Sequence, residues 1–255
     1  MRRLVSDTLV MAERNLVRFP RAPELLVAFT VQPVMFVLLF RYVFGGAINT
    51  GGIPYVEFLI PGIIVQNIAF GGFVTALGLN EDVHKGLIDR FRSLPMARPA
   101  VLAGRTLSDV VTNLLSMTVL TITGLIIGFS FQDTSALNVI AGVGLMLLFG
   151  YAFSWVFALV GLLVSSPEAA NSFGFIAIFP LTFISSAFVP PASMPSVLRA
   201  FADVNPFTYV VDAIRHLWIG FPAGNHVWGA VVWALAIIAV FAPLAVYRYR
   251  RAAGG

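Results

Sequence analysis

Six long stretches of the chain are apolar and almost free of charge, and shorter polar connections separate them. A hydrocarbon core of about 30 Å needs roughly 20 such residues in one helix. Spanning segments are helical or belong to closed barrels, because backbone polar groups find no water there. The pattern predicts an all-α integral membrane protein, one domain over 1–255, with six transmembrane helices at about 25–44, 58–80, 107–130, 136–165, 170–190 and 227–247.

Composition supports the membrane class. Hydrophobic residues make up 58% of the chain and charged residues 11%, whereas a soluble domain carries about 25% charged residues. This excludes a soluble enzyme, a disordered tail and a coiled coil. The net charge of +4 fits basic cytoplasmic loops better than nucleic-acid binding, so we expect no nucleic-acid partner. The sequence contains no cysteine, which excludes disulfides and thiolate chemistry.

Lysine and arginine gather on one side of the predicted spans. The N-terminal segment, the connection over 80–105 and the C-terminal tail hold 13 of the 16 basic residues, and the other side has only Arg41, Arg199 and Arg215. Basic residues concentrate in cytoplasmic loops. We therefore expect a multi-pass protein of the plasma membrane with both termini in the cytoplasm.

The first 20 residues have helical spacing without the length of a span. Apolar residues recur at one helical face, while charged residues lie largely elsewhere; the apolar set is Val5, Leu9, Ala12, Leu16 and Phe19. This pattern is typical of an amphipathic helix in the membrane interface. The chain is therefore expected to begin with an interfacial helix.

The cytoplasmic connection is expected to contain a second amphipathic helix. Asn80 is placed to cap it, Glu81 and Asp82 lie in its first turn, and Pro95 ends it. An apolar stripe follows at helical spacing: Val83, Leu87, Phe91 and Leu94. Such a helix rests on lipid headgroups or docks on a cytoplasmic partner. Charges of both signs along it favour the partner, because anionic lipid selects Lys and Arg.

The outer segment 190–225 is too polar for a span and too apolar for an ordinary loop. Asn205 and Pro206 are placed to start a helix of about 14 residues that Gly220 ends. Asp212, Arg215 and His216 lie on its polar side, where we expect exposed pairs. This helix either lies in the outer interface or dips into the membrane and returns. It serves as an anchor or as a gate, and the residues alone leave both open.

Motifs for soluble catalysis are missing from the sequence. The only lysine is Lys85, and its neighbours His84 and Gly86 do not make a phosphate-binding loop. No Gly-x-Ser-x-Gly or His-Glu-x-x-His occurs, and the three histidines are far apart in sequence. We therefore expect no enzymatic activity, no metal site and no cofactor on this chain.

Polar residues inside predicted spans need a reason, because they are costly in lipid. Gln66, Asn67 and Asn113 either line a substrate path or bond neighbouring helices. Arg105 and Asp109 are spaced i,i+4, which predicts a structural ion pair near the cytoplasmic face. The 23 phenylalanines suit an apolar path, although phenylalanines that face lipid have the same pattern.

Three segments together resemble the ABC-2 type permeases. The first is residues 81–98, from Glu81-Asp82-Val83-His84-Lys85-Gly86 to Pro95-Met96-Ala97-Arg98, followed by Gly104. The second runs from Val189-Pro190 through Met194-Pro195 to Asn205-Pro206-Phe207-Thr208-Tyr209, with Asp212 and Arg215. The end of the first span, residues 39–46, resembles the daunorubicin-resistance branch. Ala97 departs from the serine or threonine expected there.

The resemblance implies a six-span permease with a re-entrant outer hairpin, paired with a second permease chain. It implies export of a hydrophobic drug, antibiotic or lipid-like molecule, with ATP and Mg on a separate ATPase subunit. The residues it assigns to ATPase contact are Glu81, Asp82, His84, Lys85, Gly86, Leu87, Asp89, Arg90, Phe91 and Arg92. The residues it assigns to an outer gate are Asn205, Pro206, Tyr209, Asp212 and Arg215. An ion-coupled secondary transporter without an ATPase and a non-transporting scaffold are the alternatives.

Overall fold

The structure is a computed structural model that describes residues 7–13, 16, 23–50, 52–84, 99–132 and 134–252. Within these ranges every regular element is helical, which confirms the all-α class. The elements are α2 (Pro23–Leu39), the π-helix η2 (Phe40–Phe44), α3 (Tyr55–His84), α5 (Pro99–Ile126), α6 (Ala136–Leu163), α7 (Pro167–Phe183), η3 (Pro191–Ser193), α8 (Ser196–Val204), α9 (Pro206–Ile219) and α10 (His226–Ala252).

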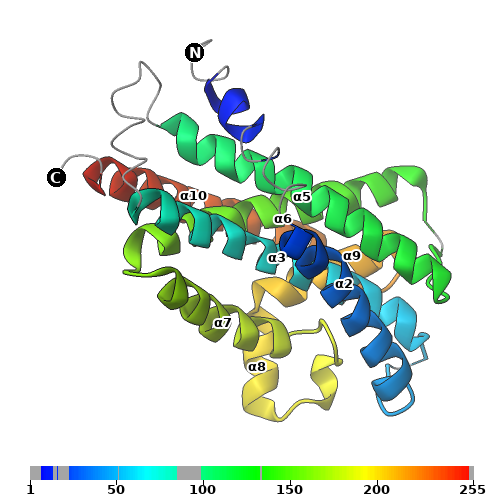
Figure 1. The fold of residues 1–255 in the computed structure, drawn as a ribbon. Helices are drawn as coiled ribbons and strands as arrows, with labels where there is room; N and C mark the ends of the chain where they lie inside the picture. The colour runs from blue at the N-terminus through cyan, green and yellow to red at the C-terminus, as the bar shows by residue number, and fades with distance from the viewer. Residues whose placement is uncertain are drawn as a thin grey trace.

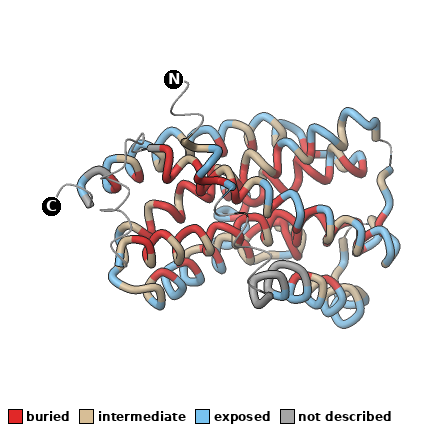
Figure 2. The backbone as a smooth tube through the Cα atoms, turned by 45° about the horizontal axis from the view of Figure 1, so that its top comes forward, coloured by how far each residue is buried: buried red, intermediate tan, exposed pale blue. Residues whose placement is uncertain are grey.

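The bundle is organised around α3 and α6 (Figure 1). Helix α3 packs against α6, α5 and α7, and α10 packs against α6 and α9. Burial agrees with the central position of α3: its most apolar 18 residues are 83% buried, whereas those of α10 are only 22% buried. Figure 2 shows the buried residues running along the middle of the bundle. The apolar outer faces of α2, α5, α7 and α10 suit contact with lipid.

Different helix termini lie at the two ends of the bundle, which we name after Tyr55 and His84. The Tyr55 end contains η2, the start of α3, the end of α5 and the start of α6. The His84 end contains the end of α3, the start of α5 and the end of α6, and α10 also finishes there (Figure 1).

Among the described residues, four helices are long and apolar enough to cross a membrane: Tyr55–His84, Ala100–Ile126, Ala136–Leu163 and His226–Tyr249. A shorter apolar helix covers Val31–Phe44, and α7 has 17 residues. The chain is therefore a multi-pass membrane protein. Residues 7–13 are helical, and Met11 and Ala12 are buried against Gly104 of α5. Leu16 is also helical, and the other residues of the expected N-terminal helix lie outside the described residues.

Helix boundaries follow capping chemistry. Ser166 accepts a hydrogen bond from the Ala169 N–H, and Pro167 takes the first position of α7. The expected start and end of the outer helix are both confirmed: Asn205 caps α9, and Gly220 ends it in the left-handed conformation at φ 67°.

One expected boundary is wrong. Asn80 does not cap a new helix, because α3 continues without a break to His84. The Asn80 side chain instead donates from Nδ2 to the carbonyls of Gly161 and Val164, at 3.2 and 2.8 Å, where α6 ends. The polar residue that suggested a helix start therefore satisfies another helix's terminal carbonyls.

Candidate functional site

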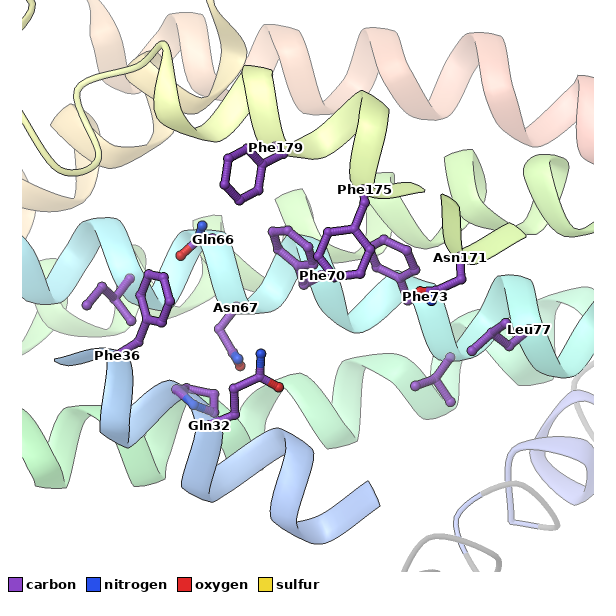
Figure 3. Close-up of a pocket in the computed structure, with 13 residues that line it drawn as sticks. Gln32, Phe36, Gln66, Asn67, Phe70, Phe73, Leu77, Asn171, Phe175 and Phe179 are labelled. Atoms are coloured by element: carbon purple, nitrogen blue, oxygen red, sulfur yellow. The ribbon is translucent and has the colours of Figure 1, made fainter. Parts of the chain in front are cut away.

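A groove of about 350 Å³ lies between α2, α3 and α7. Helix α3 forms its floor, and α2 and α7 form its two walls (Figure 3). Thirteen residues line it, and none of them is charged. They are Gln32, Pro33, Phe36, Ile63, Gln66, Asn67, Phe70, Phe73, Val74, Leu77, Asn171, Phe175 and Phe179.

Four carboxamides supply the hydrogen-bonding capacity of the groove. Figure 3 shows Asn67 and Gln32 extending toward one another across the space between α3 and α2, while Gln66 lies on the side of Phe179. Asn67 Oδ1 is buried and accepts no hydrogen bond in the described part of the chain. A buried carbonyl oxygen without a donor is costly, so a ligand with a donor group is favoured at this position.

Aromatic rings supply most of the apolar surface. Phe70 stacks on Phe73 with ring centroids 5.4 Å apart, and Phe175 lies 5.3 Å from Phe73. Phe157 of α6 supports Phe73 from behind at 4.8 Å. Edge and offset contacts of this kind also suit a planar aromatic ligand. The groove can therefore hold a flat aromatic molecule that carries hydrogen-bonding groups.

The polar span residues expected to line a path or bond helices separate into two groups. Gln66 and Asn67 line the groove. Asn113 does not: it is buried on α5, and a Cβ placed on Gly150 of α6 would come within 2.7 Å of its Nδ2. Asn113 therefore packs at the contact between α5 and α6.

At the Tyr55 end, Arg215 of α9 is fully buried, with 0% exposure. Its Nη2 donates to the carbonyls of Phe58, Ser186 and Ala187 at 2.6, 2.8 and 3.2 Å, and its Nη1 pairs with Asp212 Oδ1 at 2.9 Å. The guanidinium carbon lies 3.4 Å from the centre of the Phe58 ring. The expectation of an exposed Asp212–Arg215 pair is therefore wrong, because the pair is needed inside to satisfy irregular backbone.

Asp212 extends the same network to α10. It accepts a hydrogen bond from Ser186 Oγ at 2.8 Å, and its Oδ2 lies 3.3 Å from Nδ1 of His226, the first residue of α10. The centre of the Tyr209 ring lies 4.9 Å from that of the His226 ring, and the two rings are tilted by 60°. The expected gate residues therefore lie at a junction of α3, α9, α10 and the segment after α7.

At the His84 end, Arg105 of α5 pairs with Asp82 of α3 at 3.0 Å. Asp109 instead accepts a hydrogen bond from Thr75 Oγ1 at 2.6 Å. The expected Arg105–Asp109 pair is thus replaced by a bridge between two helices. A Cβ on Gly78 would meet Arg105 Nη2 at 1.6 Å, so glycine is what lets this side chain cross α3.

The residues expected to contact an ATPase are only partly described. Glu81, Asp82 and His84 form the last turn of α3. Lys85, Gly86, Leu87, Asp89, Arg90, Phe91 and Arg92 lie outside the described residues. The Arg105–Asp82 bridge links the two helices that enter and leave this segment.

Comparison with known proteins decides the family. The model of the ABC-2 type transporter family matches residues 6–219. The chain belongs to the ABC-2 type transporter family. It is 37% identical over 247 residues to the daunorubicin resistance ABC transporter permease protein DrrB1 of Streptomyces coeruleorubidus, covering 96% of this chain and 87% of that protein.

More distant relatives of this ABC-2 permease also align over most of its length. The probable doxorubicin resistance ABC transporter permease protein DrrC of Mycobacterium tuberculosis is 27% identical, covering 98% of this chain and 91% of that one. The putative transport permease ycf38 of Cyanophora paradoxa is 25% identical over 84% of this chain and 74% of that one. The resemblance seen in the sequence is confirmed. This chain is a transporter's membrane subunit, and ATP hydrolysis belongs to a separate subunit.

Sequence reasoning missed most of the ABC-2 permease's groove. Gln32 and Asn171 are polar residues within or beside expected spans, so the cost of polar groups in lipid was a usable signal for both. The phenylalanines gave no such signal. Phe175 lines the groove and Phe173, two residues away, does not, although the two side chains are exposed to a similar degree.

Proposed function

We propose that this ABC-2 permease exports flat, aromatic, drug-like molecules from the cytoplasm, using ATP hydrolysis by a partner subunit. The groove between α2, α3 and α7 is the observation that carries the proposal. It is uncharged, rich in phenylalanine and supplied with four carboxamides. The relatives named for daunorubicin and doxorubicin resistance support the same class of cargo.

The proposed topology has six spans, formed by α2 with η2, α3, α5, α6, α7 and α10. In this topology the His84 end and both termini face the cytoplasm, which the distribution of basic residues supports. Helices α8 and α9 form a re-entrant hairpin from the outer side. In support, the ring of Phe207, near the start of α9, lies 5.3 Å from those of Phe149 and Phe153, halfway along α6. Near the end of α9, Trp218 donates from Nε1 to Val139 O at the start of α6.

Single cysteines test this topology cleanly, because the chain has none of its own. Replacements of Ser93 and Ala253 should react with an impermeant maleimide only after the cytoplasmic side is opened. Replacements of Asn49, Ser135 and Asn225, all exposed at the Tyr55 end, should react in intact cells. Labelling of the Ser93 variant from outside would contradict the orientation.

The proposed energy source is an ATPase docked on residues 81–92, in an assembly of two permease and two ATPase chains. Charge reversal at a contact that excludes water can cost several kcal/mol. Arg90→Glu and Asp89→Lys should therefore each reduce co-purification of the ATPase and its drug-stimulated hydrolysis. Arg199→Glu is the matched control, because Arg199 is exposed on α8, outside the proposed docking segment.

The central test is transport by the reconstituted complex. Inverted vesicles that hold the permease and its ATPase should accumulate daunorubicin only with ATP. Uptake by the permease alone, driven by an ion gradient, would favour the secondary-transporter alternative. No uptake in either preparation, with both proteins correctly assembled, would contradict the drug-export proposal.

A further inference from the structure

A run of phenylalanine rings in mutual contact lies at the Tyr55 end of the groove. Phe36 and Phe179 are the outermost rings of its two walls. One helical turn further out, Phe40 follows Phe36 at a centroid distance of 5.2 Å, and Phe183 follows Phe179 at 4.3 Å. Phe188 joins the two walls: its ring lies 4.7 Å from Phe40 and 4.9 Å from Phe183.

Phe188 is held firmly on one side of this run of rings. It is 3% exposed, and it follows an unwound segment. The backbone carbonyls of that segment accept hydrogen bonds from side chains of α9 and its cap. Asn205 Nδ2 donates to Leu181 O and Ile184 O at 2.7 Å each, and Arg215 donates to Ser186 O and Ala187 O. Moving Phe188 would break these bonds together.

Phe40 is held much more loosely. It begins the π-helix η2, a conformation that is rare in proteins and frequently occurs at functional sites. No side chain between residues 31 and 44 forms a hydrogen bond or ion pair with another helix in the described part of the chain. Pro33 also removes one backbone hydrogen bond from α2, two turns below Phe40.

We propose that Phe40 and Phe188 are the outer closure of the cargo path, with Phe188 fixed and Phe40 moving away with η2 during export. The proposal rests on the proposed export function. Separating the rings loses an offset-stacked contact, which is weak beside the bonds that hold Phe188. A flat aromatic cargo stacks on each ring as they part, whereas an aliphatic cargo does not. The pair therefore favours aromatic cargo as well as closing the path.

A reversible crosslink tests the movement. Phe40→Cys/Phe188→Cys, assembled with the ATPase in inverted vesicles, is treated with a short bis-methanethiosulfonate reagent. Daunorubicin transport should fall at least tenfold and return on reduction. ATP hydrolysis and daunorubicin binding should stay within about threefold, because the groove below the closure is intact. Each single-cysteine variant with the same reagent is the control.

Transport at the uncrosslinked rate in a fully crosslinked preparation would overturn the closure. The two proposals fail differently: a wild-type complex that moves no daunorubicin contradicts the export proposal, whereas an unchanged rate after full crosslinking, in a complex whose wild-type form transports, contradicts only the closure. If the double-cysteine protein folds poorly, conservative single substitutions test the same proposal. Phe40→Leu should reduce daunorubicin transport at least threefold, while Phe44→Leu, on the same π-helix but without a ring contact to Phe188, should stay within twofold. Equal effects of the two substitutions would also overturn the proposal.

Discussion

The two walls of the groove differ in how they are attached to the rest of the molecule. The wall made by α7 continues into an unwound segment that Asn205, Thr208, Asp212 and Arg215 of the α9 region bind. The wall made by α2 and η2 has only apolar and ring contacts between residues 31 and 44 of the described chain. Its residues Met35, Tyr42 and Val43 are largely exposed.

This difference has a simple physical cause. Unwound backbone in a membrane protein leaves carbonyls and N–H groups that lipid cannot satisfy, so the protein has to supply their partners. A regular helix satisfies its own backbone and needs no such partners. The wall that continues into unwound backbone is therefore the stiff one, and the helical wall of α2 and η2 is free to move. An exporter with this construction opens by displacing α2 rather than α7.

The largest expected effect is on stability, and it comes from removing the Arg215 side chain, which binds the unwound segment after α7. Arg215→Ala leaves three carbonyls and a buried Asp212 without their partner. Breaking a buried ion pair by removing one side costs about 3–5 kcal/mol. The purified permease should lose roughly 10 °C or more in melting temperature, measured by heating in detergent and size-exclusion chromatography.

Arg199→Ala is the matched control for this substitution, since Arg199 is an exposed arginine on the neighbouring helix α8. Its melting temperature should match that of the unmodified protein within about 2 °C, because exposed substitutions usually stay within ±0.5 kcal/mol. If Arg215→Ala melts like Arg199→Ala, the α7 wall does not depend on this network and the comparison of the walls fails.

A smaller effect is expected where α3 touches the same unwound segment. A Cβ on Gly62 would lie 2.1 Å from the carbonyl oxygen of Ala187, and backbone cannot move aside easily. Gly62→Ala should therefore cost about 1–3 kcal/mol, the usual range for overpacking.

Gly144→Ala is the comparison variant for Gly62→Ala. Gly144 lies within α6, and nothing is within 4 Å of an added Cβ. This variant should gain about 0.5–1 kcal/mol, because alanine restricts the unfolded chain and favours helix. Denaturant unfolding in mixed micelles, followed by tryptophan fluorescence, measures both changes. Equal stability of the two variants would mean that α3 and the segment after α7 are not in rigid contact.

The sequence predicted the parts of this fold that depend on local chemistry. Asn205, Pro206 and Gly220 define α9 because capping and turn preferences act over a few residues. The membrane class and the family were accessible because apolar length and motif order are properties of the chain itself. The polar character of Gln66 and Asn67 likewise singled out two residues that line the groove, without deciding between a path and a helix contact.

Partners that come from distant parts of the chain were not accessible in this way. Arg215 looks like the polar side of an exposed helix, and nothing local indicates that Phe58, 157 residues away, supplies its main acceptor. Asn80 has the local signature of a cap, but tertiary contact with the end of α6 decides its role. The same holds for the groove, whose floor and two walls come from three separate helices.

The smallest expected effect is on cargo binding by two carboxamides that line the groove, one on a firmly packed helix and one on a loosely attached helix. Gln66 stands on the buried helix α3 and is 9% exposed, whereas Gln32 stands on the loosely attached α2 and is exposed. Replacing either by leucine keeps a good helix former, so stability should change by less than about 1 kcal/mol. A hydrogen bond to cargo contributes about 0.5–1.5 kcal/mol, and ordering a free glutamine costs up to about 2 kcal/mol of rotamer entropy. Gln66→Leu should therefore weaken daunorubicin binding roughly 3- to 10-fold, and Gln32→Leu less than about twofold, measured by equilibrium fluorescence quenching. A larger loss for Gln32→Leu would show that α2 holds cargo as a preorganised wall, and the division into a stiff and a loose side would then be wrong for the bound state.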